Sequence, residues 1–530
     1  MLTNVAELVR EAARERPDAV ALREATDGRR ITWAQLDELV DRAATGYLGL
    51  GLIAGYRVLL SSGNSIEFIA AYLGALRVGL VAVPVNPRST PRELQTMVVD
   101  ARPRVVLADT AAIETVRQVV TSLASESAVA AEKPLTPRVV ALDGEVLDGE
   151  LGWAEFTARL TTPAAPPADA EALAALLYTS GTSGNPRGAM LTHRALLANI
   201  EQVGSTEGAM VRPDDVVFGL LPLFHIYGLN GVLGQVINQK AELVLANGFD
   251  PIGTLEMIQR EQITVLPIVP VAIAHWMSTD VAVVDLAAKL SSVRLVLSGS
   301  APLSPDLGRD FTERTGHAVH QGYGLTEAAP VVTLTLSSGS LQPGSVGAAV
   351  PGVELRLVDE SGSAPESGDA GEILIKGDNL FSGYWPDGLD GPDAEGWWAT
   401  GDMGYLDSAG ELFLVDRVKE LVIVSGFNVY PIEIEELLEE LPEVESAAVI
   451  GVEDPVTGEA VVAYLKPAAG YSPQEVKQAA MLRAQTNLAR FKQPSQWHVV
   501  ADLPFTVTGK VRKGLLRATE RRRALGLLDH

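Results

Sequence analysis

The chain has 530 residues, of which 47% are apolar and 21% charged, so we expect a globular protein with more than one domain. Its formal net charge of −25 argues against nucleic acid as a partner, because such binding needs a basic surface. The absence of cysteine excludes disulfides, cysteine metal sites and a cysteine nucleophile, and the seven histidines form no H-E-x-x-H zinc pattern.

Residues 1 to about 160 predict an α/β block. Apolar residues recur at helical spacing in 5–18 and 32–52. Short apolar runs such as RVLLSS (57–62) and RVVLAD (104–109) fit buried parallel strands. Helices alternating with such strands indicate an α/β fold class.

The longest apolar stretch, residues 68–85, is interrupted by Arg77 and Gly79. We therefore expect a buried helix followed by a strand rather than a membrane span. The first residues contain acidic side chains and no long apolar segment, unlike a signal peptide. These features predict a cytoplasmic protein.

A proline- and alanine-rich stretch at 161–172 predicts a linker. The apolar run 172–177, the loop YTSGTSGNPRG (178–188) and the helix-like AMLTHRALLANI (189–200) follow it. A strand, a small hydroxyl-rich loop and a helix form a shape that binds phosphate through backbone N–H groups. The loop is not a Walker loop, because no lysine followed by serine or threonine stands at the required spacing. On its own, the pattern also fits an exposed surface loop.

A second α/β block follows, with strand-like runs such as ELVLA (242–246). Residues 345–415 are richer in β pattern, since GEILIKG alternates and MGYLDSAGELFLVD predicts a hairpin turning at 407–410. Residues 420–530 predict a small α+β unit. One of its helices begins at Pro431 with acidic residues behind it, as the helix dipole favours.

Three further motifs carry candidate chemistry. HQGYGLTEAAPV contains Thr326 and Glu327, and a carboxylate beside a phosphate site suits Mg²⁺; the alternative is that Thr326 caps a helix. WWATGDMGYL has Asp402 in a glycine-flanked bend before a strand, where it could accept ribose hydroxyls or be an ordinary turn residue. LPFTVTGKVRKGLLR presents Lys510, which could also be a solvated surface lysine.

Taken together, seven motifs in this order resemble the core motifs of the adenylate-forming (AMP-forming) enzyme superfamily, and most closely its acyl-CoA synthetases. The motifs are YTSGTSGNPRG, LPLFHIYG, SGSAPLS, QGYGLTE, WWATGD, DRVKELVIVSGFNVYPIEIE and PFTVTGK. They extend over essentially the whole chain, so the resemblance covers all of it.

The resemblance implies a large N-terminal AMP-binding domain (1–416) of α/β subdomains with a β-rich subdomain, and a small mobile α+β C-terminal domain (417–530). It also implies a two-step reaction that uses ATP, Mg²⁺ and CoA. A carboxylate first joins the α-phosphate of ATP and pyrophosphate leaves. A thiol then attacks the acyl adenylate and AMP leaves.

The resemblance also assigns the nucleotide site. The β- and γ-phosphates are assigned to the loop residues Thr179, Ser180, Gly181, Thr182, Ser183 and Gly184, with Arg187 beside them. The adenine is expected between Ser300, Ala301, Gln321, Gly322 and Tyr323. Thr326 is expected at the α-phosphate and Glu327 at Mg²⁺, while Asp402 takes the ribose hydroxyls with Arg417 nearby.

The C-terminal domain is expected to serve both steps. By resemblance, Lys510 bridges the carboxylate and the α-phosphate during adenylation, a role that suits a flexible ammonium. Lys419 matches the hinge about which the domain turns. This rotation would withdraw Lys510 and bring Ser425, Gly426 and Phe427 to the path of CoA.

One residue departs from the family pattern. The loop usually reads Pro-Lys-Gly, and here Arg187 stands in place of the lysine. Charge is kept but geometry is not, because a guanidinium is a planar fork and an ammonium a point charge. We expect an effect on the rate more than on the class of reaction.

The acid is expected to be uncharged beyond its carboxylate. Relatives that activate amino acids usually have an aspartate where this chain has His225. We count His225 with the catalytic residues, as a gate or wall of the acyl pocket. The alternative is a histidine that is simply packed in the core. The remaining pocket residues are expected to be Ile226, Tyr227, Gly228, Gly231, Gly299, Gly324 and Leu325. Gly228, Gly231 and Gly234 could leave one helix face bare for an apolar tail, or allow close helix packing.

We therefore favour a medium- or long-chain fatty acid, with an aryl acid of the plant type as the second choice. CoA is preferred to a carrier protein as acceptor, because VSGFNVYPIEIE resembles bacterial fatty acyl-CoA synthetases. Luciferase-like oxidation fits poorly, since Ile423 stands where such enzymes have a second lysine. Peripheral membrane contact and a homodimer are left open.

Overall fold

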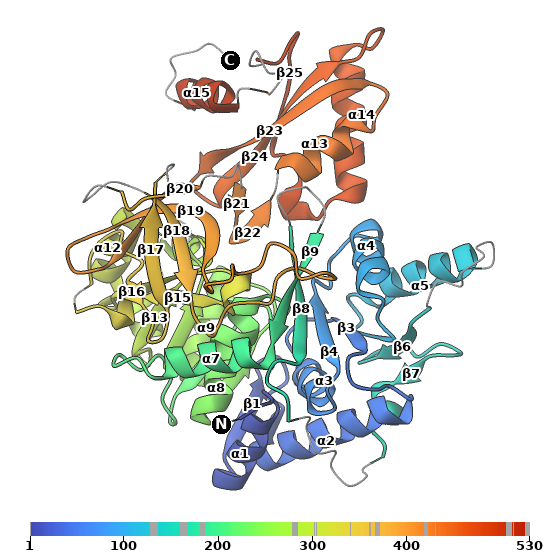
Figure 1. Ribbon diagram of the computed structural model, residues 1–530, viewed down its shortest axis with the longest axis vertical. Helices are drawn as coiled ribbons and strands as arrows, with labels where there is room; N and C mark the ends of the chain where they lie inside the picture. The colour runs from blue at the N-terminus through green and yellow to red at the C-terminus, as the bar shows by residue number, and fades with distance from the viewer. Residues whose placement is uncertain are drawn as a thin grey trace.

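The computed structural model describes residues 2–127, 136–159, 168–180, 186–277, 285–301, 303, 305–339, 341–359, 362–365, 371–417, 422–429, 431–504, 511 and 513–524. Two α/β sheets with their helices form the lower part of the molecule in Figure 1, and the C-terminal α+β unit stands at the top.

A seven-stranded sheet forms the first α/β layer. Its strands in spatial order are β7 (Leu151–Gly152), β6 (Arg138–Ala141), β5 (Val105–Ala108), β3 (Arg57–Ser61), β4 (Val81–Val85), β8 (Leu173–Ser180) and β9 (Pro186–Thr192). All neighbours are parallel except β8 and β9. The helices of this layer are α2 (Trp33–Gly49), α3 (Ile66–Arg77), α4 (Pro91–Ala101), α5 (Ile113–Ser127) and α6 (Trp153–Phe156).

The predicted buried helix and strand of residues 68–85 are confirmed as α3 and β4. All five residues of β4 are buried, and so is nearly the whole of α3. Among the described residues, no helix combines the length and apolar character that crossing a membrane requires.

A nine-stranded sheet forms the second α/β layer. Its order is β16 (Ala348–Ala349), β15 (Val331–Leu334), β14 (Val319–Gly324), β13 (Leu295–Ser298), β12 (Val265–Ile268), β10 (Val216–Gly219), β11 (Glu242–Leu245), β1 (Val20–Glu24) and β2 (Arg30–Thr32). Its helices are α1 (Glu7–Glu15), α7 (His193–Gly204), η1 (Tyr227–Gly234), α8 (Gln235–Gln239), α9 (Pro251–Glu261), α10 (Pro270–Met277), α11 (Leu286–Lys289), α12 (Pro305–Thr315), η3 (Thr326–Ala328) and η4 (Thr335–Ser337).

The two layers exchange strands, which the sequence did not predict. β1 and β2 come from the first block but extend the second sheet, where Leu22 pairs with Leu243. β8 and β9 follow the linker but complete the first sheet, where Ala175 pairs with Ala82. The predicted division into two consecutive blocks at the linker is therefore wrong in this respect. Pairing follows the apolar faces that meet in space, not their order in the chain.

The segment after the glycine-rich loop also differs from the expectation. We predicted a helix directly after the loop, but residues Pro186–Thr192 form β9 and pair with β8. The helix α7 begins only at His193, because the Thr192 side chain caps it by accepting the Ala195 N–H at 3.2 Å. The loop therefore closes a hairpin rather than joining a strand to a helix.

The β-rich subdomain is an antiparallel sheet of four strands. They are β17 (Glu354–Val358), β18 (Gly371–Lys376), β19 (Trp398–Leu406) and β20 (Leu412–Arg417). The predicted alternation is confirmed in β18, whose residues are buried and half-buried in turn. The predicted hairpin is confirmed as β19 and β20, with the Gly410 N–H bonded to the Asp407 carbonyl at 3.0 Å.

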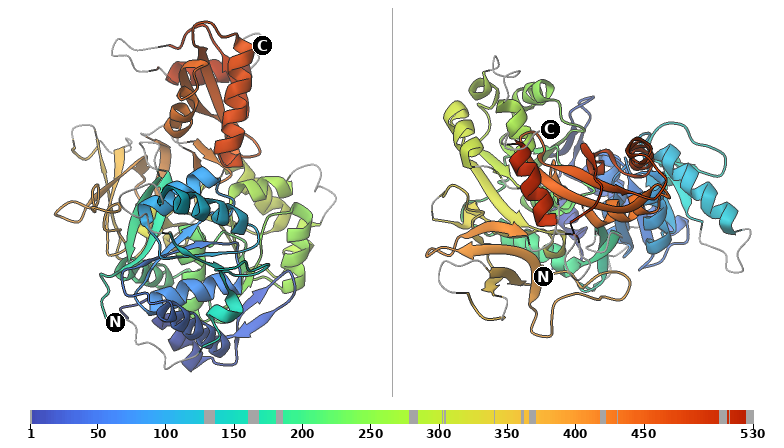
Figure 2. Two further views of the ribbon diagram at one scale, coloured as in Figure 1. Left: turned by 90° about the vertical axis from the view of Figure 1, so that its right-hand side faces the viewer. Right: turned by 90° about the horizontal axis from the view of Figure 1, so that it is seen from above.

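The C-terminal unit contains a five-stranded sheet with helices packed against it. Its strands are β22 (Phe427–Val429), β21 (Val422–Val424), β24 (Gly458–Pro467), β23 (Val444–Asp454) and β25 (Gln496–Val499). Its helices are α13 (Pro431–Glu439), α14 (Pro473–Asn487), η5 (Arg490–Lys492) and α15 (Lys513–Ala524). Helix α13 begins at Pro431, as predicted. In the left view of Figure 2 this unit packs on one end of the larger part, and in the right view it is seen from above, in front of that part.

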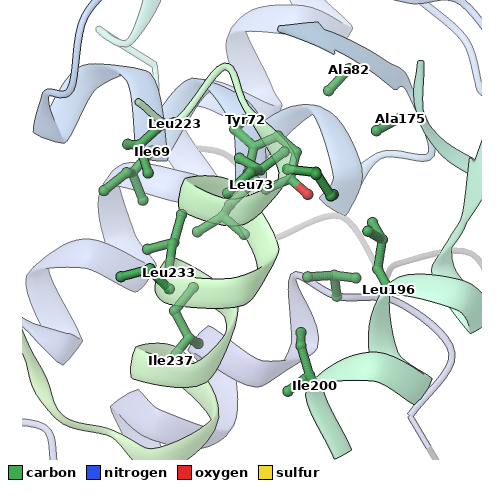
Figure 3. Packing of buried hydrophobic residues seen from close by; sticks show 14 of the residues in the cluster. Ile69, Tyr72, Leu73, Ala82, Ala175, Leu196, Ile200, Leu223, Leu233 and Ile237 are labelled. Atoms are coloured by element: carbon green, nitrogen blue, oxygen red, sulfur yellow. The ribbon is translucent and has the colours of Figure 1, made fainter. Parts of the chain in front are cut away.

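The core beneath the site holds the π-helix η1 in place. Figure 3 shows its centre, where Leu233 and Ile237 lie near Leu73 of α3 and Ile200 of α7. These side chains are at most 2% exposed, and burying each contributes roughly 1.5–3 kcal/mol. Because η1 is fixed on both sides, the position of its first residue, Tyr227, is fixed as well.

Candidate active site

A buried carboxylate lies at the centre of the candidate site. Glu327 of η3 is 8% exposed, and its Oε1 accepts a hydrogen bond from the Tyr384 hydroxyl at 2.5 Å. Burial raises the pKa of Glu327, as does the charge of Asp402, while the Tyr384 hydrogen bond and the Arg187 charge oppose the shift. The Tyr384 hydrogen bond thus orients the carboxylate, and no described residue forms an ion pair with it.

Arg187 is linked to the Glu327 carboxylate by Tyr384, which contacts both residues. Its guanidinium lies 3.8 Å from the centre of the Tyr384 ring and pairs with Asp390 at 2.6 Å. Sequence reasoning identified Glu327 and Arg187 but missed Tyr384 and Asp390. Tyr384 is 57 residues from Glu327 in the chain, so no local pattern connects them.

The residues predicted to surround the adenine lie where strands of the second sheet end. β13 and β14 are parallel neighbours, so their carboxyl ends meet at one edge of the sheet, where α/β proteins bind ligands. The structure brings together there the residues predicted to surround the adenine, namely Ser300, Ala301, Gln321, Gly322 and Tyr323. Ser300 has a φ of 69°, an uncommon backbone conformation that is frequent at functional sites.

Asp402 is joined directly to this edge. The Tyr323 hydroxyl donates to Asp402 Oδ2 at 2.8 Å. In the backbone register of β19 and β20, Asp402 lies opposite Arg417. The predicted bend before a strand is wrong, since Asp402 lies inside β19. It follows Gly401, whose φ of 76° supplies the local irregularity.

The structure describes only the two ends of the loop that is predicted to bind phosphate. Thr179 and Ser180 close β8, and the Ser180 backbone pairs with Pro186 of β9. Gly181, Thr182, Ser183 and Gly184 lie outside the described residues, as do Lys419 and Lys510. Thr326, the first residue of η3, is half-buried and does not cap a helix through its side chain, so that alternative is not observed.

The ring of Tyr227 lies against two of the glycines predicted to line the acyl pocket. A Cβ built on Gly299 would lie 3.0 Å from the ring, and one on Gly231 would lie 2.9 Å from it. The Tyr227 hydroxyl donates to the Leu297 carbonyl at 3.4 Å, and burial raises its pKa, so the phenol stays protonated. The two glycines therefore make room for an aromatic side chain of the protein itself.

The other predicted pocket glycines serve close packing. A Cβ on Gly228 would lie 2.3 Å from the Pro222 carbonyl oxygen, and one on Gly324 would lie 2.2 Å from that of Pro330. Gly234 packs in the same way against the Ile200 side chain. The alternative of close packing thus holds for Gly228 and Gly234, and Gly231 is the exception in that series.

His225 stands at the entrance to η1. Its Nδ1 accepts the Tyr227 N–H at 3.3 Å, and burial lowers its pKa to about 4. The imidazole is therefore neutral near pH 7 and cannot act as a charged partner for the carboxylate of an acid. Its neighbour Ile226 is buried, and Leu325 is half-buried beside Gly324.

Two family models match the chain. The model described as AMP-binding enzyme matches residues 9–385, and the model described as AMP-binding enzyme C-terminal domain matches residues 433–510. The chain belongs to the AMP-binding enzyme family. The predicted resemblance to adenylate-forming enzymes is confirmed.

Relatives of this AMP-binding enzyme include two kinds of CoA ligase. 4-Coumarate–CoA ligase 3 of Oryza sativa subsp. japonica is 34% identical over 520 residues, which are 95% of this chain and 89% of the relative. The long-chain-fatty-acid–CoA ligase of Bacillus subtilis (strain 168) is 33% identical over 491 residues, which are 88% and 86% of the two chains. The chain is therefore an AMP-forming acid–thiol ligase.

A solved relative has the same architecture over nearly its whole length. The amide bond synthetase McbA from Marinactinospora thermotolerans superposes with a TM-score of 0.84 at 26% identity, covering 97% of this chain and 99% of that one. The likeness extends over both the large and the small domain.

The AMP-binding enzyme brings one turn of its C-terminal domain to this site. Ser425 and Gly426 join β21 to β22, and both have positive φ, 52° and 82°, as a type I′ turn requires. A Cβ on Gly426 would lie 3.5 Å from Val269 and 3.6 Å from the Ser300 side chain. Phe427 follows the turn and stacks on Phe491 with ring centres 4.5 Å apart.

Proposed function

We propose that this ligase activates an aryl acid and transfers the acyl group to CoA. The observation that carries the proposal is the Tyr227 ring, which lies between Gly231 and Gly299 and takes up room that a long tail would need. A flat aromatic acid could stack against this ring, with a preference of about 0.5–1.5 kcal/mol beyond the area it buries. The 4-coumarate–CoA ligase of rice is a relative whose name fits this substrate class.

In the first step, a carboxylate oxygen of the acid bonds to the α-phosphorus of ATP and the bond to pyrophosphate breaks. The loop from Thr179 to Gly184 would bind the outgoing phosphates, with Arg187 beside them. Thr326 would contact the α-phosphate, and Asp402 with Tyr323 would orient the ribose. Lys510 would bring a positive charge to the reacting oxygens, because repulsion between two anions opposes the attack.

A magnesium ion fits the residues at Glu327. In the described part of the chain, no three His, Asp or Glu side chains gather as a resident metal site would require. Mg²⁺ commonly binds through one or two carboxylates together with substrate phosphates, and Glu327 is a single buried carboxylate oriented by Tyr384. Bound there, the ion would neutralise phosphate charge.

In the second step, the sulfur of CoA bonds to the acyl carbon, AMP leaves with the former bond electrons, and the thiol proton is released. The turn at Ser425 and Gly426, with Phe427, would line the path of the thiol. A neutral His225 would form a wall of the pocket without competing for the acyl carboxylate.

A medium- or long-chain fatty acid is the second candidate. It is favoured by residues 223–239, which contain no charged side chain before Lys240, and by the Bacillus subtilis relative. A tail could enter only if the Tyr227 ring moved. A cytoplasmic location, a homodimer and peripheral membrane contact stay predictions.

Pyrophosphate release measured over cinnamate-type acids and fatty acids of graded length, with and without CoA, tests the proposal. We expect CoA-dependent turnover with aryl acids, and a shift toward fatty acids by about ten-fold or more in Tyr227→Ala. Tyr227→Phe is the matched control, since it keeps the ring. A fatty-acid optimum in the unaltered protein would replace aryl acids with the second candidate.

A further inference from the structure

A buried ion cluster joins the two domains close to the turn at Ser425. The Lys492 ammonium of η5 lies 3.3 Å from Glu93 of α4 and 2.8 Å from Glu433 of α13. The three side chains are only 11%, 13% and 14% exposed. Glu433 and Lys492 belong to the C-terminal domain, whereas Glu93 belongs to the large domain, so one contact of the cluster crosses between them.

Glu93 is held rigidly by its own helix. Its Oε2 accepts the Thr90 N–H at 2.9 Å and the Thr90 hydroxyl receives the Glu93 N–H at 3.3 Å, which together form the capping box of α4. Its other oxygen, Oε1, meets Lys492. The Thr90 hydroxyl also donates to the Asn487 carbonyl of α14 at 3.3 Å. The first turn of α4 is therefore a fixed docking point for the small domain.

Lys492 is connected directly to the CoA side of the site. Its neighbour Phe491 stacks on Phe427, which follows the turn that contacts Ser300 and Val269. A displacement of η5 would move Phe491 and hence this turn. The contact of Lys492 with α4 and the position of the turn at Ser425 therefore both depend on η5.

The cluster is electrostatically suited to reversible docking. Burial lowers the pKa of Lys492, but Glu433 and Glu93 outweigh this effect and the net shift is upward, so the ammonium stays charged. When the domain turns away, Lys492 keeps Glu433 as its ion-pair partner. Only the contact between Lys492 and Glu93 is lost. Losing one contact while a second remains costs less than leaving a buried charge without any partner.

We propose that Glu93 and Lys492 are positioning residues for the acyl transfer to CoA. They hold the C-terminal domain in the arrangement that keeps Ser425 and Gly426 at the active site, and they separate when Lys510 enters for adenylation. This inference rests on the proposed two-step reaction. Neither residue touches substrate; both act through the domain they dock.

The two half-reactions, measured separately in the full chain, test this role. In Lys492→Met we expect transfer from supplied acyl-AMP to CoA to fall about ten-fold or more, with acyl-AMP formation changed by less than about three-fold. Glu93→Gln should act in the same direction more weakly, because glutamine still completes the capping box. Lys492→Arg should restore most of the transfer rate.

The matched control is Arg92→Gln on the same helix turn. Arg92 pairs with Glu440 at 2.9 Å across the same interface, but the two side chains are 49% and 45% exposed, so little effect is expected. An equal fall of both half-reactions in Lys492→Met would overturn the proposal. So would a higher KM for CoA at unchanged kcat, because that result would mean direct contact with CoA.

A second measurement does not depend on activity. The chain has no cysteine, so the pair Arg92→Cys and Glu440→Cys introduces two unique thiols on opposite sides of the interface. A short bifunctional thiol reagent should link them in otherwise unaltered protein, and the yield should fall several-fold when Lys492→Met is added. An unchanged yield overturns the proposal, whichever acid the enzyme activates. Absence of acyl-AMP with every acid, together with the expected fall in yield, would instead refute the proposed function and keep the docking role.

Discussion

The residues proposed to bind the nucleotide and those proposed to line the path of CoA are held by different kinds of contact. Within the large domain, the Tyr384 hydroxyl donates a hydrogen bond to Glu327 at 2.5 Å. The Tyr323 hydroxyl donates another to Asp402 at 2.8 Å. The turn at Ser425 instead belongs to a separate domain, which contacts α4 of the large domain. Under the proposed function, one half of the chemistry would therefore use contacts preassembled in the large domain, and the other would depend on how the second domain is docked.

The largest expected effect comes from the preassembled half. Glu327→Gln keeps the size of the side chain and removes its charge, so acyl-AMP formation should fall by about 10²-fold or more. Transfer from supplied acyl-AMP should change little. Pyrophosphate release and CoA thioester formation, measured separately, check this prediction, and Tyr384→Phe is the milder control. Equal losses in both steps would break the comparison between the two ends.

Lys510→Ala tests whether the C-terminal domain also serves the first step. Removing an ammonium from the reacting oxygens should lower acyl-AMP formation by about 10²-fold, while transfer from supplied acyl-AMP stays largely intact. The same two assays apply. If both steps fell together, Lys510 would be acting on the fold or on docking instead of on adenylation.

The architecture was largely predictable because seven spaced motifs and the local apolar patterns agree. The strand exchange between the two sheets was not, since the partners of β1 and β8 are distant in sequence. Tyr384 was missed for the same reason. The sequence motifs pointed to carboxylates and hydroxyls as candidate ligands, which stays a prediction, but the contacts between these side chains arise only when distant segments fold together.

The glycine series shows a different limit. Gly228, Gly231 and Gly234 look alike in sequence, and their spacing left two interpretations open, room for an apolar tail or close helix packing. In the structure, two of them allow close approach of neighbouring segments and the third faces the Tyr227 ring. A missing side chain leaves room, but only the folded chain shows which atoms fill it.

The large domain contains a buried histidine, His193, whose protonation should lower the stability of the fold at acid pH. His193 of α7 is 1% exposed, and its Nδ1 accepts the Val5 N–H at 3.3 Å, which ties the N-terminal segment to the sheet. Burial lowers its pKa to about 4, with an opposing effect of Asp169. The unfolded chain therefore binds this proton more readily than the folded one as pH falls from about 6.5 to 4.

The free energy of unfolding should consequently fall through this window, by up to about 3 kcal/mol from His193 alone. Denaturant titrations at pH 7, 5.5 and 4.5 measure it. His193→Gln should lower the stability at pH 7 and flatten this part of the pH dependence. An unchanged slope in that variant would assign the acid sensitivity to other groups.

The smallest expected effect concerns Arg187, which stands where relatives usually have lysine. Its guanidinium both stacks on Tyr384 and pairs with Asp390, and an ammonium cannot do both in the same geometry. Arg187→Lys should lower kcat/KM for ATP by roughly three- to ten-fold, since the stack and one ion pair at a partly exposed site contribute about 1 kcal/mol. Transfer from supplied acyl-AMP should not change.

Asp390→Asn separates the two contacts of Arg187, because it removes the ion pair and leaves the stack on Tyr384. If this variant behaves like the unaltered enzyme while Arg187→Lys is impaired, the stack is the contact that matters. The arginine then orients Tyr384, and Tyr384 orients Glu327, so the substitution of arginine for lysine belongs to the preassembled half of the site. Full activity of Arg187→Lys would instead mean that only its charge is used.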